Sequence, residues 1–174
     1  MSVLDSFSLK GKTAVVSGAT RGLGRAFARA LAEAGANIVV VGRDAVAAAE
    51  VEAEMASLAV GATTVLADVT QRDDVERMLA HTVAAFGRAD VLVNNAGVCI
   101  HKPAVDVTDA DWRAVMDVNL DGVWVMSQVF GSAHDRAGRR LDRERGLHVR
   151  VDRQPPAMAA GVQRLEGRRA PPDP

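Results

Sequence analysis

Residues 13–24 read TAVVSGATRGLG, and this stretch decides the fold. Its first five residues form a short apolar run typical of a buried strand, and an amphipathic helical pattern begins at Gly22. Glycines at such a turn let the backbone approach a pyrophosphate closely, and the N-terminus of the next helix attracts phosphate charge. Glycine-rich turns also occur without any ligand. Because this loop lies between a predicted strand and a predicted helix, it indicates a dinucleotide site.

The alternation of strand and helix continues to about residue 130. Short apolar runs without strict alternation predict buried parallel strands covered on both faces, and they lie at 13–17, 37–41, 63–67 and 91–94. Apolar residues at three- and four-residue spacing predict helices at 22–34, 44–58 and 73–86, and a further helix begins near Asp109 behind Thr108 as its N-cap. The sequence therefore predicts an α/β fold: a partial doubly wound parallel sheet in three α/β/α layers, with strand order 3-2-1-4.

Composition divides the chain near Gly131. The sequence contains no tyrosine, its last aromatic residue is Phe130, and five of its six prolines follow in an arginine-rich stretch. Apolar residues in this stretch do not recur at the spacing of a helix or a strand, and two Pro-Pro pairs interrupt any helix or strand. We expect one domain at 1–131 and a largely disordered, non-native tail at 132–174.

Charge and composition argue against several classes of protein. The net charge is −1, and the arginines of the tail alternate with acidic residues and lack aromatic neighbours, so we expect no nucleic-acid partner. Cys99 is the single cysteine, which excludes an intrachain disulfide, and no metal-ligand motif is present. No apolar run reaches membrane-spanning length and no secretion signal is recognisable, so we expect a cytoplasmic protein without a membrane partner.

Further motifs follow the glycine loop in a characteristic order. Asp68-Val69 ends the third predicted strand, Asn94-Asn95-Ala96-Gly97 ends the fourth, and Val118-Asn119 lies in the helix behind it. Taken alone, Asp68 could be a helix cap, the Asn94-Asn95-Ala96-Gly97 segment could be an ordinary turn, and Asn119 could be a solvated helix residue. Together with the Gly-x-x-x-Gly-x-Gly spacing, they resemble the short-chain dehydrogenase/reductase family, whose fold is a Rossmann fold.

The resemblance implies a set of cofactor-binding residues. Gly18, Arg21, Leu23 and Gly24 would surround the pyrophosphate with Gly22 in the same loop, Asp68 and Val69 would contact the adenine, and Asn95, Ala96 and Gly97 would contact the ribose beside the nicotinamide.

The residues after the second predicted strand bear on the choice of cofactor. In NAD-preferring family members an acidic residue there binds the adenosine ribose, whereas this chain has Gly42-Arg43-Asp44. Gly42 leaves space, and Arg43 supplies a planar, permanent charge suited to a 2′-phosphate, with Arg21 as a second cation. Alternatively, Arg43 is an exposed loop residue and Asp44 a helix cap. NADP(H) is favoured, and Asp44 keeps NAD(H) as an alternative.

The catalytic residues of the family are largely absent. The family transfers a hydride between a nicotinamide and an alcohol or carbonyl carbon, using a tyrosine, a lysine four residues later, a serine and an asparagine. Only Asn119 has a counterpart, because tyrosine is absent and the last lysine is Lys102. The resemblance thus implies an NAD(P)-dependent oxidoreductase of small alcohols or carbonyl compounds, normally a homo-oligomer, of which this chain is an inactive, truncated part. Residues 98–103 resemble those of polyol or sugar-alcohol dehydrogenases. The alternatives are a non-catalytic nucleotide-binding module and a non-functional fragment.

The tail has a second interpretation in another reading frame. Codons can be chosen for residues 161–174 that, read one base later, give Ala-Tyr-Asn-Ala-Ser-Lys-Ala-Ala-Val-His-His-Leu-Thr, which resembles the family's catalytic helix. Codons for residues 142–152 likewise yield Ile-Val-Asn-Val-Ala-Ser-Met-Ser-Gly-Ser, which resembles the next strand and its serine. Two such segments in one frame and in family order are hard to obtain by chance. Our hypothesis is a frame shift near residues 131–134.

Overall fold

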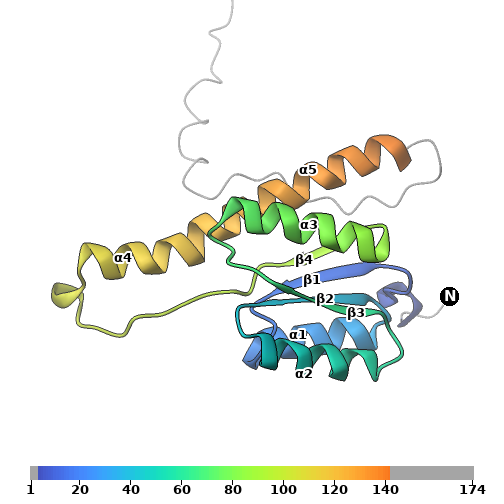
Figure 1. Cartoon of the computed structure of the whole chain (residues 1–174), viewed down its shortest axis with the longest axis horizontal. Coiled ribbons are helices and arrows are strands. Elements are labelled where there is room, and N and C mark those ends of the chain that lie inside the picture. The colour runs from blue at the N-terminus through green and yellow to red at the C-terminus, as the bar shows by residue number, and fades with distance from the viewer. Residues whose placement is uncertain (1–3, 142–174) are drawn as a thin grey trace, which may run out of the picture.

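A parallel sheet of four strands forms the centre of the protein (Figure 1). The computed structural model describes residues 4–141, with the side chains of residues 6–133. The strands are β1 (Thr13–Ser17), β2 (Asn37–Gly42), β3 (Ala62–Leu66) and β4 (Val91–Val93). Their order is β3-β2-β1-β4, with all neighbours parallel. The predicted α/β fold class and strand order are confirmed.

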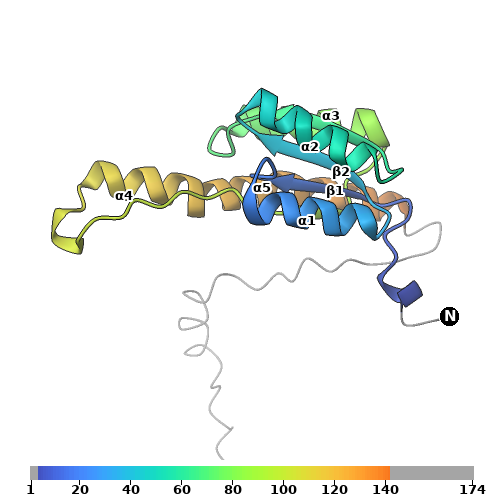
Figure 2. The same cartoon turned by 90° about the horizontal axis from the view of Figure 1, so that it is seen from below.

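Helices cover both faces of this sheet, which gives three layers (Figures 1 and 2). The α-helices are α1 (Gly22–Glu33), α2 (Ala45–Ala56), α3 (Arg72–Phe86), α4 (Asp109–Met116) and α5 (Val123–Leu141). Short 3-10 turns lie at η1 (Leu4–Phe7) and η2 (Ala104–Asp106), and a π-helical turn, η3 (Asp117–Gly122), joins α4 to α5. Helices α1 and α2 pack on one face, and α3 and α5 pack on the other.

The ends of several helices follow from single residues. Asp44 caps α2 by accepting hydrogen bonds from the N–H groups of Val46 and Ala47, and Thr108 caps α4 in a reciprocal capping box with Asp111. Gly87 ends α3 at φ 76°, a left-handed conformation that glycine adopts without steric cost. The predicted N-cap at Thr108 is confirmed.

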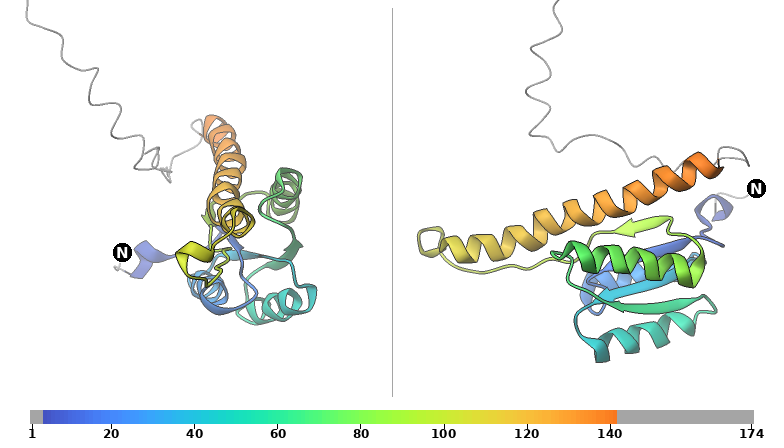
Figure 3. Two further views of the ribbon diagram at one scale, coloured as in Figure 1. Left: turned by 90° about the vertical axis from the view of Figure 1, so that its left-hand side faces the viewer. Right: turned by 45° about the horizontal axis from the view of Figure 1, so that its top comes forward.

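Beyond Phe130 the chain differs from the sequence-based expectation. Helix α5 continues to Leu141, so residues 132–141 are helical where the composition predicts the start of a disordered tail. A helix that is already nucleated and packed extends at little cost, and Ala, Arg and Leu all favour it. Together α4, η3 and α5 form one continuous helical rod (Figure 3). The rest of the predicted tail, residues 142–174, lies outside the described residues.

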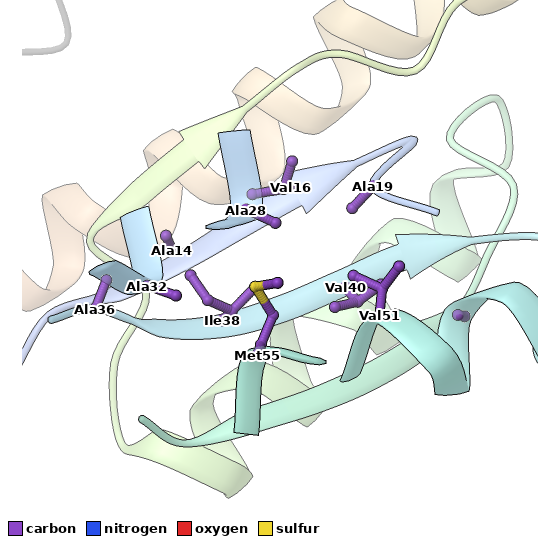
Figure 4. Close-up of a cluster of buried hydrophobic side chains, with 11 residues drawn as sticks. Ala14, Val16, Ala19, Ala28, Ala32, Ala36, Ile38, Val40, Val51 and Met55 are labelled. Atoms are coloured by element: carbon purple, nitrogen blue, oxygen red, sulfur yellow. The ribbon is translucent and has the colours of Figure 1, made fainter. Parts of the chain in front are cut away.

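The core consists of two layers of side chains, one on each face of the sheet. Between the sheet and α1 and α2, alanines of α1 let the helix approach closely, and larger residues of β2 and α2 fill the remaining space (Figure 4). On the opposite face Met126, Val129 and Phe130 of α5 pack with residues of β1, β2 and α3. Every residue of β1 is buried, whereas the three residues of β4 are only half-buried.

Replacing Ile38 should measure how much the α1/α2 layer contributes to stability. The Ile38 side chain is 0% exposed, so Ile38→Ala leaves a cavity and should lower the free energy of unfolding by about 2–5 kcal/mol. Val46→Ala is the control, because Val46 is 71% exposed and should change stability by less than about 0.5 kcal/mol. Urea unfolding followed by circular dichroism compares the two variants, and equal effects would contradict this account of the core.

Candidate functional site

A hollow of about 370 Å³ opens where the carboxyl ends of the strands meet. The predicted cofactor residues that line it are Gly18, Arg21, Leu23, Gly24, Arg43, Asp68, Val69, Asn95, Ala96 and Gly97. The chain leaves β1 on one side to form β2 and later returns on its other side to form β4. In open α/β sheets such a reversal of strand order creates the crevice in which ligands bind.

The glycine loop fits closely against the end of β4. Gly18 has φ 64°, and a Cβ atom there would lie 2.9 Å from the Cα atom of Ala96. A Cβ atom on Gly24 would lie 2.1 Å from the carbonyl oxygen of Gly18, which is too close for any side chain. Gly22 has φ 55°, but a Cβ atom there would meet nothing within 4 Å, and it does not line the hollow. Gly18 and Gly24 are therefore required by packing, and Gly22 by its backbone conformation.

A small polar network joins β1 to β4 beneath this loop. The buried Ser17 hydroxyl donates to the carbonyl of Val93 at 3.2 Å and accepts from the N–H groups of Asn95 and Ala96 at 3.0 and 3.1 Å. The Asn95 amide donates to the carbonyls of Ser17 and Gly18 at 3.1 and 3.2 Å. Ser17 is not among the predicted site residues, because in the sequence it is the last residue of a predicted strand. The feature of the sequence that could have identified Ser17 is a single hydroxyl side chain at the end of an apolar run.

The N-terminus of α1 faces the hollow without a capping side chain. Its N-cap residue, Arg21, makes no side-chain cap bond, and no acidic residue lies in its first turn. By contrast, Asp44 and Thr108 cap α2 and α4 with their side chains. The first N–H groups of a helix need acceptors and carry partial positive charge. This end of α1 therefore suits an anionic group.

Four charged side chains line the hollow, the cations Arg21 and Arg43 and the carboxylates Asp44 and Asp68. Arg43 lies 4.0 Å from Asp68, and its side chain is 72% exposed, so this ion pair holds it only weakly. Asp44 directs one oxygen to the N–H groups of Val46 and Ala47 at 3.0 and 3.1 Å. Asp44 thus caps α2, as one of the two sequence-based interpretations expects, and Arg43 is free to reorient toward a ligand.

Asp68 occupies its position through a turn at the end of β3. One of its carboxylate oxygens accepts from the N–H and hydroxyl of Thr70 at 2.9 and 2.8 Å. Its own N–H donates to Asp74 at 2.9 Å, and this bond, together with Arg77, lowers the pKa of the Asp74 carboxyl below its ordinary value. The turn holds Asp68 and Val69 at the rim of the hollow.

Asn119 supports the loop after β4. Its amide nitrogen donates to the carbonyl of Val98 at 2.9 Å, and its oxygen accepts from the N–H of Val98 at 2.8 Å. Asn119 lies in the π-helical turn η3 and does not itself line the hollow, whereas its neighbours Val98 and Val118 do. Such turns recur at functional sites, where they redirect side chains. Here Asn119 positions the backbone that closes one side of the hollow.

Lys102 does not replace the missing catalytic lysine. Its ammonium lies 2.6 Å from Asp111, and this contact, with Thr108, lowers the pKa of Asp111 to about 2. Lys102 therefore ties the loop after β4 to the start of α4, and it does not line the hollow.

Other kinds of site find no support in the described part of the chain. Residues 4–141 contain no group of three or more His, Cys, Asp and Glu side chains that could hold a metal ion. No helix in the same residues combines the length and apolar character needed to span a membrane. Several further residues line the hollow without having been predicted as site residues, namely Thr20, Val41, Ala47, Ala67 and Val98.

Known proteins resemble this chain over its first three quarters. The profile of the short chain dehydrogenase family matches residues 12–139. The 2-dehydro-3-deoxy-D-gluconate 5-dehydrogenase of Escherichia coli (strain K12) is 39% identical over 126 residues, which covers 72% of this chain and 49% of the relative. The NADP-dependent (R)-specific alcohol dehydrogenase of Lentilactobacillus kefiri is 38% identical over 147 residues, 82% of this chain and 53% of that enzyme.

Solved structures agree with these relatives. A short-chain type dehydrogenase/reductase from Mycobacterium marinum matches with a TM-score of 0.77 at 36% identity, over 79% of this chain and 56% of that one. A gluconate 5-dehydrogenase from Burkholderia cenocepacia, in complex with NADP and tartrate, matches with a TM-score of 0.73 at 36% identity. The match covers 79% of this chain and 54% of that one. The chain spans about half the length of the curated relatives it matches. By fold, motifs and sequence, it belongs to the short-chain dehydrogenase family.

Proposed function

We propose that residues 1–131 are the dinucleotide-binding half of an NADP(H)-dependent oxidoreductase, and that this chain binds the cofactor without turning over a substrate. The observation that carries the proposal is the hollow at the carboxyl ends of the strands, which gathers every predicted cofactor residue except Gly22 from four separate loops. A cytoplasmic location, and a homo-oligomer for the intact protein, belong to the same proposal.

The shape and polarity of the hollow fit a dinucleotide. Gly18 and Gly24 leave room that a Cβ atom would fill, and the uncapped N-terminus of α1 offers N–H groups to a pyrophosphate. Asp68 and Val69 would hold the adenine, and the backbone at 95–97 the nicotinamide ribose. Bound NADP(H) would supply the hydride chemistry. The residues of this chain would bind and orient the cofactor.

The charges beside β2 favour NADP(H) over NAD(H). Arg43 is exposed and weakly paired, so it can bind a 2′-phosphate, and Arg21 lies on the same hollow. Asp44 accepts two backbone hydrogen bonds and is less available to a ribose. Two of the similar proteins are described with NADP, the Lentilactobacillus kefiri enzyme and the Burkholderia cenocepacia structure. Binding of NAD(H) with equal affinity remains the alternative outcome.

For the intact protein we propose a small polyhydroxylated alcohol or carbonyl substrate. Two of the similar proteins are gluconate-type dehydrogenases, and residues 98–103 resemble polyol or sugar-alcohol dehydrogenases. Asn119 is the remnant of the catalytic group that this chain retains. No tyrosine is available as acid or base, and Lys102 is paired with Asp111. A non-catalytic nucleotide-binding module is the second candidate, favoured by a complete binding hollow beside a missing acid–base group.

A frame shift explains why the chemistry is missing. Codons for residues 134–141 can also be chosen so that, one base later, they read Met-Ile-Glu-Arg-Gly-Gly-Gly-Ser. This segment leads without a break into the strand segment Ile-Val-Asn-Val and from there, without a stop codon, to Tyr-Asn-Ala-Ser-Lys. The family match ends at residue 139, close to the proposed shift. We therefore propose that the native C-terminal half lies in this alternative frame.

Gly24→Ala should abolish cofactor binding. The new methyl group would meet the carbonyl of Gly18 and push the loop from its place against Asn95. Gly131→Ala is the control, because a Cβ atom there meets nothing within 4 Å and alanine favours a helix by about 0.5–1 kcal/mol. Titration calorimetry with NADPH, beside thermal unfolding, should show lost binding for Gly24→Ala and unchanged binding for Gly131→Ala. Unchanged binding by Gly24→Ala would refute the site.

Arg43→Ala should remove the preference for NADPH. A charged hydrogen bond to phosphate contributes ~1.5–3 kcal/mol, so the NADPH affinity should fall about ten-fold or more while the NADH affinity stays nearly constant. Arg113→Ala, which removes an exposed charge on α4 away from the hollow, is the matched control. Equal affinities for NADPH and NADH in the unaltered chain would show that Arg43 does not select the cofactor.

Restoring the alternative frame after about residue 133 should create dehydrogenase activity. The chain as given should show no NADP-dependent oxidation of simple alcohols or polyols, because loss of acid–base catalysis alone costs ~10²–10⁴-fold. The frame-restored protein regains the serine, tyrosine and lysine and should turn over. Its Tyr→Phe variant should again be inactive. Sequencing the gene checks the premise, since codons that do not give Tyr-Asn-Ala-Ser-Lys one base on from Gly161 would rule out the frame shift.

A further inference from the structure

The turn between β3 and α3 fixes most of the polar groups of Asp68. Its carbonyl oxygen accepts from the N–H of Gln71 at 3.0 Å, and its own N–H donates to the carboxylate of Asp74 at 2.9 Å. One of its carboxylate oxygens accepts from the N–H and the hydroxyl of Thr70 at 2.9 and 2.8 Å. These hydrogen bonds hold both the backbone and the side chain of Asp68 in one orientation.

The second carboxylate oxygen of Asp68 remains available as an acceptor. It makes no hydrogen bond to any of residues 6–133, and a guanidinium nitrogen of Arg43 lies 4.0 Å from it. Asp68 lines the hollow, and its side chain is 38% exposed. An ionised carboxylate accepts hydrogen bonds and donates none. This oxygen therefore favours a ligand that presents an N–H group, as the amino group of adenine does, over one that presents a carbonyl oxygen at the same place.

Asp74 reaches this turn from the first turn of α3. It is the third residue of the helix, and a carboxylate at that position commonly accepts from the N–H of the N-cap residue, as Asp111 does with Thr108 in α4. The N-cap residue of α3 is Gln71, which makes no side-chain cap bond. Asp74 instead accepts from the N–H of Asp68, three residues further back in the chain. Asp74 therefore stabilises the position of Asp68 at the rim of the hollow.

The side chain of Asp74 is itself held in place, unlike that of its neighbour Asp73. The second oxygen of Asp74 accepts from Arg77 at 2.8 Å, and the Asp74 side chain is only 24% exposed. The carboxylate of Asp73 lies in the same helical turn but makes no hydrogen bond or ion pair with any of residues 6–133. Both carboxylates lie near the positive end of the helix dipole. Only Asp74 also contacts Asp68.

We propose that Asp74 is a positioning residue for the base of the cofactor: its hydrogen bond to the N–H of Asp68 directs the available Asp68 oxygen to the amino group of an adenine. The inference rests on the proposed function, in which Asp68 and Val69 hold the adenine. It adds that the hollow selects a purine with an amino group over one with an oxygen at that position. This selectivity depends on Asp74, which does not itself line the hollow.

Binding of two dinucleotides to the full chain tests the proposal. One is NADPH, and the other is its hypoxanthine analogue, which carries an oxygen in place of the amino group of adenine. The unaltered chain should bind NADPH about ten-fold more tightly, because the analogue loses a hydrogen bond to a charged group. Asp74→Ala should lower the affinity for NADPH by about the same factor and leave the affinity for the analogue nearly unchanged. Titration calorimetry measures both dissociation constants.

Two further variants separate positioning from stability. Asp74→Asn keeps an oxygen that can accept from the N–H of Asp68, so it should retain most of the preference for NADPH. Asp73→Ala removes a carboxylate from the same helical turn but no contact with Asp68, so its preference should equal that of the unaltered chain. In hydrogen exchange, the amide of Asp68 should lose protection in Asp74→Ala and keep it in Asp73→Ala. Circular dichroism checks that each variant is folded.

The possible results distinguish this proposal from the proposed function. Equal affinities of the unaltered chain for the two dinucleotides overturn the positioning proposal and leave the proposed function standing, and this result does not depend on any variant. An equal loss of affinity for both dinucleotides in Asp74→Ala assigns Asp74 a merely structural role and also overturns the proposal alone. If the unaltered chain binds neither dinucleotide, both the proposed function and the positioning proposal are wrong.

Discussion

The hydroxyl of Ser17 is the contact on which the hollow at the carboxyl ends of the strands depends. It joins the carboxyl end of β1 to the backbone of Asn95 and Ala96 after β4, and Asn95 in turn holds the carbonyls of Ser17 and Gly18. The two strands are neighbours in the sheet, but about 75 residues apart in the chain, as in other doubly wound folds. This network adds to the pairing of β1 with β4 and fixes the glycine loop against the end of β4. The loop and the N-terminus of α1 therefore face one hollow.

The central strands and the glycine loop could be predicted because their signals are local. Residues 13–17 and 37–41 are continuous apolar runs, and the observed strands begin and end within one residue of them. Ser17 is not among the predicted site residues, since its hydrogen-bond partners come from a distant segment. The π-helical turn at Asn119 has no local signature, and it arises where α4 meets α5 over the end of the sheet. The helical stretch after Phe130 was missed because composition outweighed the continuity of a packed helix.

The hollow and the arginine- and proline-rich stretch lie in different parts of the chain. The hollow is built from loops that follow β1, β2, β3 and β4, all within the described residues. The stretch after residue 131 is rich in arginine and proline, and the whole sequence lacks tyrosine. Under the proposed function, such a chain binds the cofactor but lacks the acid–base group that catalysis needs. Among residues 4–141, β4 pairs with β1 and with no other strand.

The most direct test of the central claim is a nuclear magnetic resonance titration of the isotope-labelled chain with NADPH. Backbone amide signals of Gly18, Gly24, Arg43 and Asn95 should shift together and saturate at one affinity, because all four line one hollow. The amide of Val105, on the exposed loop before α4, should stay in place. Saturating shifts confined to other residues, or no shifts at millimolar NADPH, would contradict the account.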